Sequence, residues 1–187
     1  MELIKPNYTR VSTVLSIFQQ YSYVPSAKLK RAQDIGVDVH AAIETYFRGD
    51  FEPLSVRRVP YFESFLKWVE IFKPNPLLFE ERFYDDKLMI TGRIDLLARK
   101  DDQVVLIDFK TGSWAHPEIW ELQATFYRYL LEINEYPYLP ERFFFVQLMK
   151  DGSAPLTFEF KYDEKNFGIC LSSWRCWKFF QKDVVSN

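Results

Sequence analysis

The chain has 187 residues, of which 48% are hydrophobic and 18% aromatic, and its formal net charge is -2. This composition excludes an extensively disordered chain and gives no global basic signature, so a contact with a polyanion would depend on local patches. Candidate patches are residues 28–31 (KLKR), Arg57 with Arg58, and the Lys and Arg residues of the C-terminal helix. Neither a signal-peptide pattern nor an apolar run of about 18 residues occurs, which predicts an intracellular, cytoplasmic protein without a membrane partner.

No Gly/Ser-rich or Pro-rich linker divides the sequence, so we expect a single domain over residues 1–187. Cys170 and Cys176 are too few for an iron-sulfur cluster or a structural zinc site, and both are expected to be buried free thiols. No G-x-x-x-x-G-K-[ST] motif is present, so no use of ATP is expected. The expected parts are an N-terminal helical segment, a central core and a C-terminal helix, at residues 1–76, 77–162 and 163–182.

Helical periodicity dominates the first third of the chain. A short helix is expected over residues 10–18, with Ser12 or Thr13 as its candidate cap, followed by an aromatic-rich loop through Pro25. Apolar residues then recur at steps of three and four, and Gly49 ends this second helix. A third helix is expected over VPYFESFLKWVEIF, which stops before two prolines.

From Leu77 the apolar period changes to two. Three strands, at residues 77–86, 88–100 and 103–112, are separated by short polar turns and predict an antiparallel meander. The remaining elements are a helix, two strands and a closing helix, at residues 116–135, 142–150, 156–162 and 164–182. This order predicts an α/β fold of the α+β kind, with a mixed sheet of about five strands flanked by helices.

The second and third of these strands form a hairpin that carries charged residues. If residues 101–102 form its turn, Asp95 lies directly opposite Asp108. Arg93 then lies opposite Lys110, and all four side chains share one face. The other face would be a continuous apolar layer, made by Ile94, Leu96, Ala98, Val105, Ile107 and Phe109.

Two carboxylates directly across a strand pair repel each other unless something positive lies between them. Mg²⁺ suits this position because it is commonly held by one or two carboxylates, waters and a substrate phosphate. Lys110 could neutralise that phosphate or position and help deprotonate a water, and Gly92 would leave room for a substrate backbone. The alternative is a surface hairpin with solvated acids, although VVLIDFK is too apolar for an exposed edge strand.

Two flanking helices carry further candidates. His40 and Glu44 share a helix face, so His40 could ligate a metal while Glu44 or a water holds its tautomer. Gln123 and Tyr127 share a face of a later helix and could bind a substrate phosphate or sugar, or Lys110 and its water. The alternatives are a packed or solvated histidine and a helix that is simply docked on the sheet.

Trp114 and Trp120 flank the start of that later helix. Exposed tryptophans could stack on unpaired bases, whereas the alternative is that both belong to the core.

Four short motifs occur in a fixed order, GVDVH, TGRID, IDFKTG and QATFY. Taken together they resemble the PD-(D/E)XK nuclease superfamily, specifically its RecB-like branch, over roughly residues 30–132. The resemblance implies a restriction-endonuclease-like core. Similar cores belong to the RecB nuclease domain, the CRISPR-associated adaptation nucleases, the mitochondrial genome maintenance exonuclease and small phage nucleases, which favours a bacterial or phage-infected cell.

By this resemblance Lys110 is the catalytic lysine, acting with Asp95 and Asp108. The implied ligands of Mg²⁺ or Mn²⁺ are His40, Asp95, Asp108 and the backbone carbonyl of Phe109.

The resemblance also implies an acid in the first strand, where Glu80 and Glu81 compete. Alternation directs them to opposite faces, and we favour Glu80. Glu44 is a further candidate acid, and the expected substrate contacts are Gln123 and Tyr127, which match the Q-x-x-x-Y pair, with Arg93 and Trp114.

The expected function is metal-dependent hydrolysis of DNA phosphodiester bonds. Small size and aromatic residues near the site favour an exonuclease that prefers single-stranded DNA or free ends. The alternatives are an endonuclease, a hydrolase of another phosphoester, and a catalytically silent module that binds DNA or a protein partner. Candidate protein partners act in recombination or replication.

Overall fold

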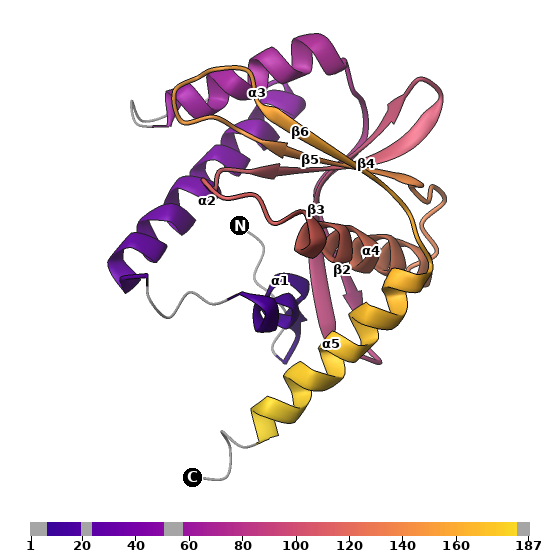
Figure 1. The fold of residues 1–187 in the computed structure, drawn as a ribbon. Coiled ribbons are helices and arrows are strands. Elements are labelled where there is room, and N and C mark those ends of the chain that lie inside the picture. The colour runs from indigo at the N-terminus through magenta and orange to yellow at the C-terminus, as the bar shows by residue number, and fades with distance from the viewer. Residues whose placement is uncertain (1–6, 20–23, 51–57, 183–187) are drawn as a thin grey trace.

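The computed structural model describes residues 7–19, 24–50 and 58–182 (Figure 1). Arg57 and residues 20–23 of the expected aromatic loop lie outside these ranges. The elements in chain order are β1 (Thr9–Arg10), α1 (Val11–Leu15), a 3-10 turn (Ser16–Phe18), α2 (Ser26–Arg48), α3 (Val59–Phe72), β2 (Asn75–Asp85), β3 (Ile90–Lys100), β4 (Gln103–Lys110), α4 (Pro117–Ile133), β5 (Arg142–Gln147), β6 (Leu156–Lys161) and α5 (Lys165–Lys182).

A mixed sheet flanked by helices confirms the expected fold class. The sheet has six strands, with the order β1-β3-β4-β5-β6 and β2 paired to β3. The predicted meander is present because β2–β3 and β3–β4 pair in antiparallel fashion, whereas β4–β5 is parallel. The strand missing from the sequence prediction is β1, whose two residues are too few to give a periodic signal.

Two strands, β1 and β4, pair with different segments of the same edge of β3. β2 covers the other edge from Ile90 to Arg99. On the shared edge, β4 pairs with residues 96–100, and β1 pairs in parallel with residues 90–91. Residues 92–95 of β3 therefore lie between these two segments, and the backbone pairing of neither β1 nor β4 extends to them.

Helices cover both faces of the sheet (Figure 1), and two apolar cores lie between the helices and the sheet. The larger, here called the α4 core, packs α1, α4 and α5 against one face and includes Leu106, Phe126 and Cys170. The smaller, the α3 core, packs α2 and α3 against the other face and includes Val39 and Phe65. The expected assignment of Cys170 as a buried thiol is confirmed, but Cys176 is exposed.

The alternation of β2 and β3 changes phase where Glu80 faces Asp95. Leu78 and Phe83 both enter the α4 core although they are five residues apart, and Ile94 and Leu97 enter it three residues apart. Glu80 has a φ of 51°, a left-handed conformation that costs a non-glycine residue about 1–2 kcal/mol. The expected apolar layer is therefore wrong at Ile94, which lies in the α4 core, whereas its other five members lie in the α3 core.

The helix ends agree with the sequence except at the first helix. Gly49, with a φ of 81°, ends α2 as expected. Arg10 occupies the position before α1 and no side chain caps that helix, so the assignment of Ser12 or Thr13 as cap is wrong. Among the described residues, no helix is both long and apolar enough to cross a bilayer.

Candidate active site

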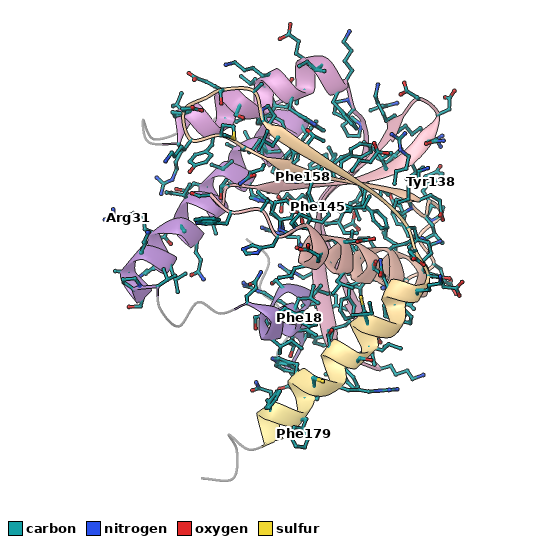
Figure 2. All side chains as sticks on the ribbon, in the orientation of Figure 1. Phe18, Arg31, Tyr138, Phe145, Phe158 and Phe179 are labelled. Carbon is teal, nitrogen blue, oxygen red and sulfur yellow. The ribbon has the colours of Figure 1, made fainter. Side chains whose placement is uncertain are left out.

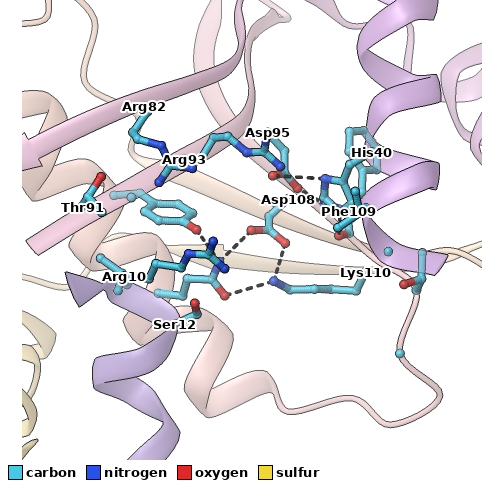
Figure 3. A pocket seen from close by; sticks show the side chains of 18 residues that line it. Arg10, Ser12, His40, Arg82, Thr91, Arg93, Asp95, Asp108, Phe109 and Lys110 are labelled. Atoms are coloured by element: carbon cyan, nitrogen blue, oxygen red, sulfur yellow. Dashed lines mark hydrogen bonds and ion pairs between the residues drawn. The ribbon is translucent and has the colours of Figure 1, made fainter. Parts of the chain in front are cut away.

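A cavity of about 390 Å³ opens where β3 and β4 separate, and it contains most of the candidate residues (Figure 3). Besides the strands β2, β3 and β4, the elements that contribute lining residues are β1, α1, α2 and α4. The candidates that line it are His40, Arg93, Asp95, Asp108, Phe109, Lys110, Gln123 and Tyr127.

Asp95 takes the place of a backbone partner for β4. The backbone pairing of the two strands runs from Lys100 with Gln103 to Leu96 with Ile107 and does not continue to Asp95 with Asp108. Instead, the backbone N–H of Phe109 donates a hydrogen bond of 2.8 Å to Oδ2 of Asp95. The expectation that the two acids face each other directly across the ladder is therefore wrong, because the strands separate one pair earlier.

His40 connects α2 to both strands. Its Nε2 lies 2.9 Å from the carbonyl oxygen of Phe109, which can only accept, so Nε2 carries the proton. Its Nδ1 lies 3.1 Å from Oε1 of Glu80 and 3.4 Å from Oδ1 of Asp95. Within the described residues, ligand atoms of His40, Glu80 and Asp95 lie within 4.8 Å of one another.

This group fits a divalent cation chemically, because imidazole nitrogen, carboxylate oxygen and the nearby carbonyl oxygen of Phe109 are donors that Mg²⁺ or Mn²⁺ accepts. Glu80, rather than Glu81, points into the group; its left-handed backbone turns the side chain inward against Asp95.

Asp108 belongs to a second network that faces α4. Its Oδ2 forms an ion pair of 2.6 Å with Nζ of Lys110, as Figure 3 shows. The side-chain amide of Gln123 donates to Oδ1 of Asp108 at 2.9 Å and to the Tyr127 hydroxyl at 2.7 Å, while Nζ of Lys110 donates to Oε1 of Gln123 at 3.0 Å. The hydrogen bonds of Gln123 thus connect Asp108, Lys110 and Tyr127.

Burial and mutual repulsion set the protonation of the acids. Burial, followed by the charge of Asp95, raises the pKa of Asp108 to about 7. Burial also raises the pKa of Glu80, although His40 and Arg93 oppose this. The pKa of Asp95 falls because His40, Lys110 and the Phe109 N–H outweigh the effect of its burial.

His40 responds in the opposite sense. Burial alone would lower its pKa, but the charges and hydrogen bonds of Asp95 and Glu80 raise that pKa well above its ordinary value. The buried carboxylates thus stabilise the protonated, positively charged form of His40, and they would stabilise a bound metal cation in the same way.

Two arginines of the cavity were missed by the sequence reasoning. Arg82 lies two residues after Glu80 and pairs with Arg93 across β2 and β3, so strand alternation contained a signal for it. Arg10 reaches the cavity through β1, which no sequence pattern predicted. Arg93 also forms an ion pair of 2.8 Å with Glu80, and together these residues make one wall of the cavity basic.

Glu44 has another role than expected, and Gly92 has an additional one. Glu44 pairs with Arg48 at 2.7 Å and does not line the cavity, so its assignment as an additional acid or as partner of His40 is wrong. A Cβ at Gly92 would lie 2.7 Å from the ring of Tyr127. The missing side chain therefore makes room for Tyr127, and because Gly92 also lines the cavity, its role in admitting a substrate backbone stays a prediction.

The two tryptophans separate into one core residue and one surface residue. Trp120 is 5% exposed and stacks on Phe145, whereas Trp114 is 81% exposed in the loop between β4 and α4.

Sequence comparison identifies the class of protein that this fold and cavity represent. Residues 55–174, more than half of the chain, match the model of the PD-(D/E)XK nuclease superfamily. The chain therefore belongs to this superfamily, whose members typically use divalent metal ions. No curated protein matches the chain.

Several solved structures are similar to the chain at low sequence identity. A putative exonuclease from Eubacterium rectale is 12% identical with a TM-score of 0.53, over 93% of this chain and 83% of that one. The protein SSO0001 is 15% identical with a TM-score of 0.48, over 94% and 78%. LHK-Exo from Laribacter hongkongensis, solved with dAMP, is 11% identical with a TM-score of 0.45, over 96% and 90%. The first of these likenesses supports the shared fold.

Proposed function

We propose that this chain is a Mg²⁺- or Mn²⁺-dependent nuclease that hydrolyses phosphodiester bonds of DNA, with a preference for single-stranded DNA or free ends. The observation that carries the proposal is the convergence of His40, Asp95, Asp108 and Lys110 at one open cavity, with Glu80 beside it in contact with His40. These groups come from four elements, α2, β2, β3 and β4, so the packing of one element does not explain why they lie together.

The proposed metal ligands are His40, Glu80, Asp95 and Asp108 with the carbonyl of Phe109. When bound, the cation would polarise a phosphate oxygen and lower the pKa of a water that attacks phosphorus. Glu80 and Asp95 would be ligands on the α2 side of the cavity, and Asp108 on the α4 side. Their burial and shared negative charge favour a cation at this place.

Lys110 is the proposed catalytic cation of the chain. Its Nζ lies 2.6 Å from Asp108 and 3.0 Å from Gln123 at the floor of the cavity. From this position Lys110 would orient the attacking water and stabilise the charge that grows on the phosphate. Gln123 and Tyr127 are positioning residues in this proposal, since both are buried and bond to the catalytic groups.

The basic wall of the cavity supports a polyanionic substrate. Arg10, Arg82 and Arg93 line it beside Lys110, although the chain as a whole is slightly acidic. Cations at this wall would attract the phosphates that flank the scissile bond and fix the strand without reading its sequence.

The test is cleavage of end-labelled linear single-stranded DNA, linear duplex and circular single-stranded DNA, with Mg²⁺, with Mn²⁺ and with a chelator. We expect metal-dependent release of labelled nucleotides from linear single strands, with little cleavage of the circle. Asp108→Ala and Lys110→Ala should abolish cleavage, whereas Lys161→Ala, which removes an exposed lysine from β6, should not change it.

Thermal melting of each variant separates loss of function from loss of folding. Cleavage that persists in folded Asp108→Ala and Lys110→Ala proteins would contradict the proposed site, and cleavage of the circle at the rate of the linear strand would contradict exonuclease action.

A further inference from the structure

Trp114 is more exposed than any other large apolar side chain in the described part of the molecule. An exposed tryptophan forgoes the favourable free energy of burying its indole ring. Trp120, six residues later, is buried in the α4 core, so this segment is able to bury an indole. Trp114 therefore presents a large aromatic face to the solvent immediately after β4, the strand that carries Asp108 and Lys110.

A second cavity of about 230 Å³ lies beneath Trp114, between α1 and the start of α4. Leu15, Ile119 and Trp120 supply apolar walls, while Gln19 and His116 supply polar groups. This slot, with apolar walls and polar groups in its lining, suits a nucleobase, whose faces are aromatic and whose edge forms hydrogen bonds.

The second cavity adjoins the first at the catalytic lysine. Ser12, Lys110, Gly112 and Gln123 line both of them. A strand whose phosphate lies beside Lys110 would therefore place an adjacent base within reach of Trp114. Gly112 and the exposed loop around Trp114 leave the approach to the slot open to the solvent.

We propose that this second cavity is a subsite for one unpaired nucleobase next to the scissile phosphate, with Trp114 as its stacking platform. The proposal rests on the proposed nuclease function and adds a reason for preference between substrates. A base inside a duplex has both faces stacked and its edge paired, so it can enter the slot only after being unpaired. The subsite thus selects single-stranded DNA or frayed ends.

Binding can be measured without cleavage in an Asp108→Ala background, using anisotropy of a labelled single strand and of the duplex with the same sequence. We expect Trp114→Ala to weaken binding of the single strand roughly 5- to 150-fold, the range found when one base-stacking aromatic is removed. Duplex binding should change much less, and Trp114→Phe should retain most of the affinity.

Phe179→Ala is the matched control because Phe179 is also a highly exposed aromatic and lies at the far end of α5 (Figure 2). It should leave both affinities unchanged.

A series of strands with one abasic nucleotide each gives the sharper test. One position should lose as much affinity as Trp114→Ala does, and at that position Trp114→Ala should cost nothing more. Equal losses on single strand and duplex, or a Trp114→Ala effect that persists at every abasic position, would overturn the subsite.

The two proposals fail differently. An unsubstituted protein that binds single strands through Trp114 but cleaves nothing with Mg²⁺ or Mn²⁺ would refute the nuclease and keep the base subsite. Cleavage that is equally fast for Trp114→Ala and unsubstituted protein on single strands at limiting concentration would refute the subsite alone.

Discussion

The two halves of the β3–β4 hairpin follow the same sequence pattern but have opposite fates. Near the turn, Lys100 to Leu96 pairs regularly with Gln103 to Ile107, and residues 96–98 and 105–107 are all apolar and buried. Near the other end, the strands separate and side chains replace the missing backbone contacts, beginning with Asp95 and the Phe109 N–H. The regular half supplies stability, whereas the separated half supplies a cavity lined with charged groups.

The largest expected effect is on activity in the separated half. Asp95→Asn keeps an oxygen that can accept from the Phe109 N–H but removes the negative charge proposed to hold the metal. We expect cleavage to fall roughly 100- to 1,000-fold or more, because the loss concerns charge stabilisation at the reacting phosphate. Cleavage rates at saturating DNA and metal, with melting temperatures measured in a chelator, would check this. A melting temperature that falls together with activity would show that Asp95 acts mainly in folding.

The next effect concerns stability in the regular half. Leu106→Ala removes a fully buried side chain from the α4 core and should lower the free energy of unfolding by about 2–5 kcal/mol. Denaturant titration measures this, and cleavage per folded molecule should be unchanged well below the melting temperature. Leu156→Ala, at an exposed leucine of β6, is the control and should change stability by less than about 0.5 kcal/mol. A similar loss in both variants would contradict the assigned core.

A smaller effect is expected at Gly92, in the separated half. Gly92→Ala would place a methyl group 2.7 Å from the Tyr127 ring and 2.8 Å from Leu130, so one of the packed groups must move. We expect a loss of about 1–3 kcal/mol in stability, and lower activity because Tyr127 holds Gln123. Gly168→Ala, in α5 with no atom near the new Cβ, should instead stabilise by about 0.5–1 kcal/mol. Full activity of Gly92→Ala would show that Tyr127 does not position the site.

The smallest effect is a gain of stability from neutralising Asp108, one of the proposed metal ligands. Because the folded-state pKa of Asp108 is raised to about 7, its stabilising contribution is present below its ordinary pKa of 3.8 and is lost as pH rises through about 7. In metal-free protein, Asp108→Asn should therefore be more stable than the unsubstituted chain by about 1 kcal/mol at pH 8. Melting curves across this pH range would test the difference, which should shrink toward pH 4. A variant that is less stable at pH 8 would indicate that the Lys110 ion pair outweighs the repulsion from Asp95.

Periodicity predicted most of the elements because it records local burial. The change from a period near 3.6 to a period of two located β2 to β4, and Asp101 with Asp102 gave the turn correctly, since both have the positive φ that a tight hairpin turn needs. The ordered motifs brought His40, Asp95, Asp108 and Lys110 together as candidates, and the fold places all four at one cavity.

Errors arose where one residue breaks the local rule. The left-handed backbone of Glu80 lies where the two strands change phase, and this change places Ile94 in the α4 core and not in the α3 core. Glu44 is four residues from His40 on one side and four residues from Arg48 on the other. It forms its ion pair with Arg48.

The sequence by itself determined the fold class, the hairpin register near its turn and the candidate acids and lysine of the site, because these depend on alternation, turn residues and short motifs. Only the tertiary structure decided that β1 brings Arg10 to the cavity, that Gly92 makes room for Tyr127, and that Trp114 faces solvent while Trp120 is buried. Each of these depends on contacts between segments far apart in the chain, and a local sequence pattern carries no record of such contacts.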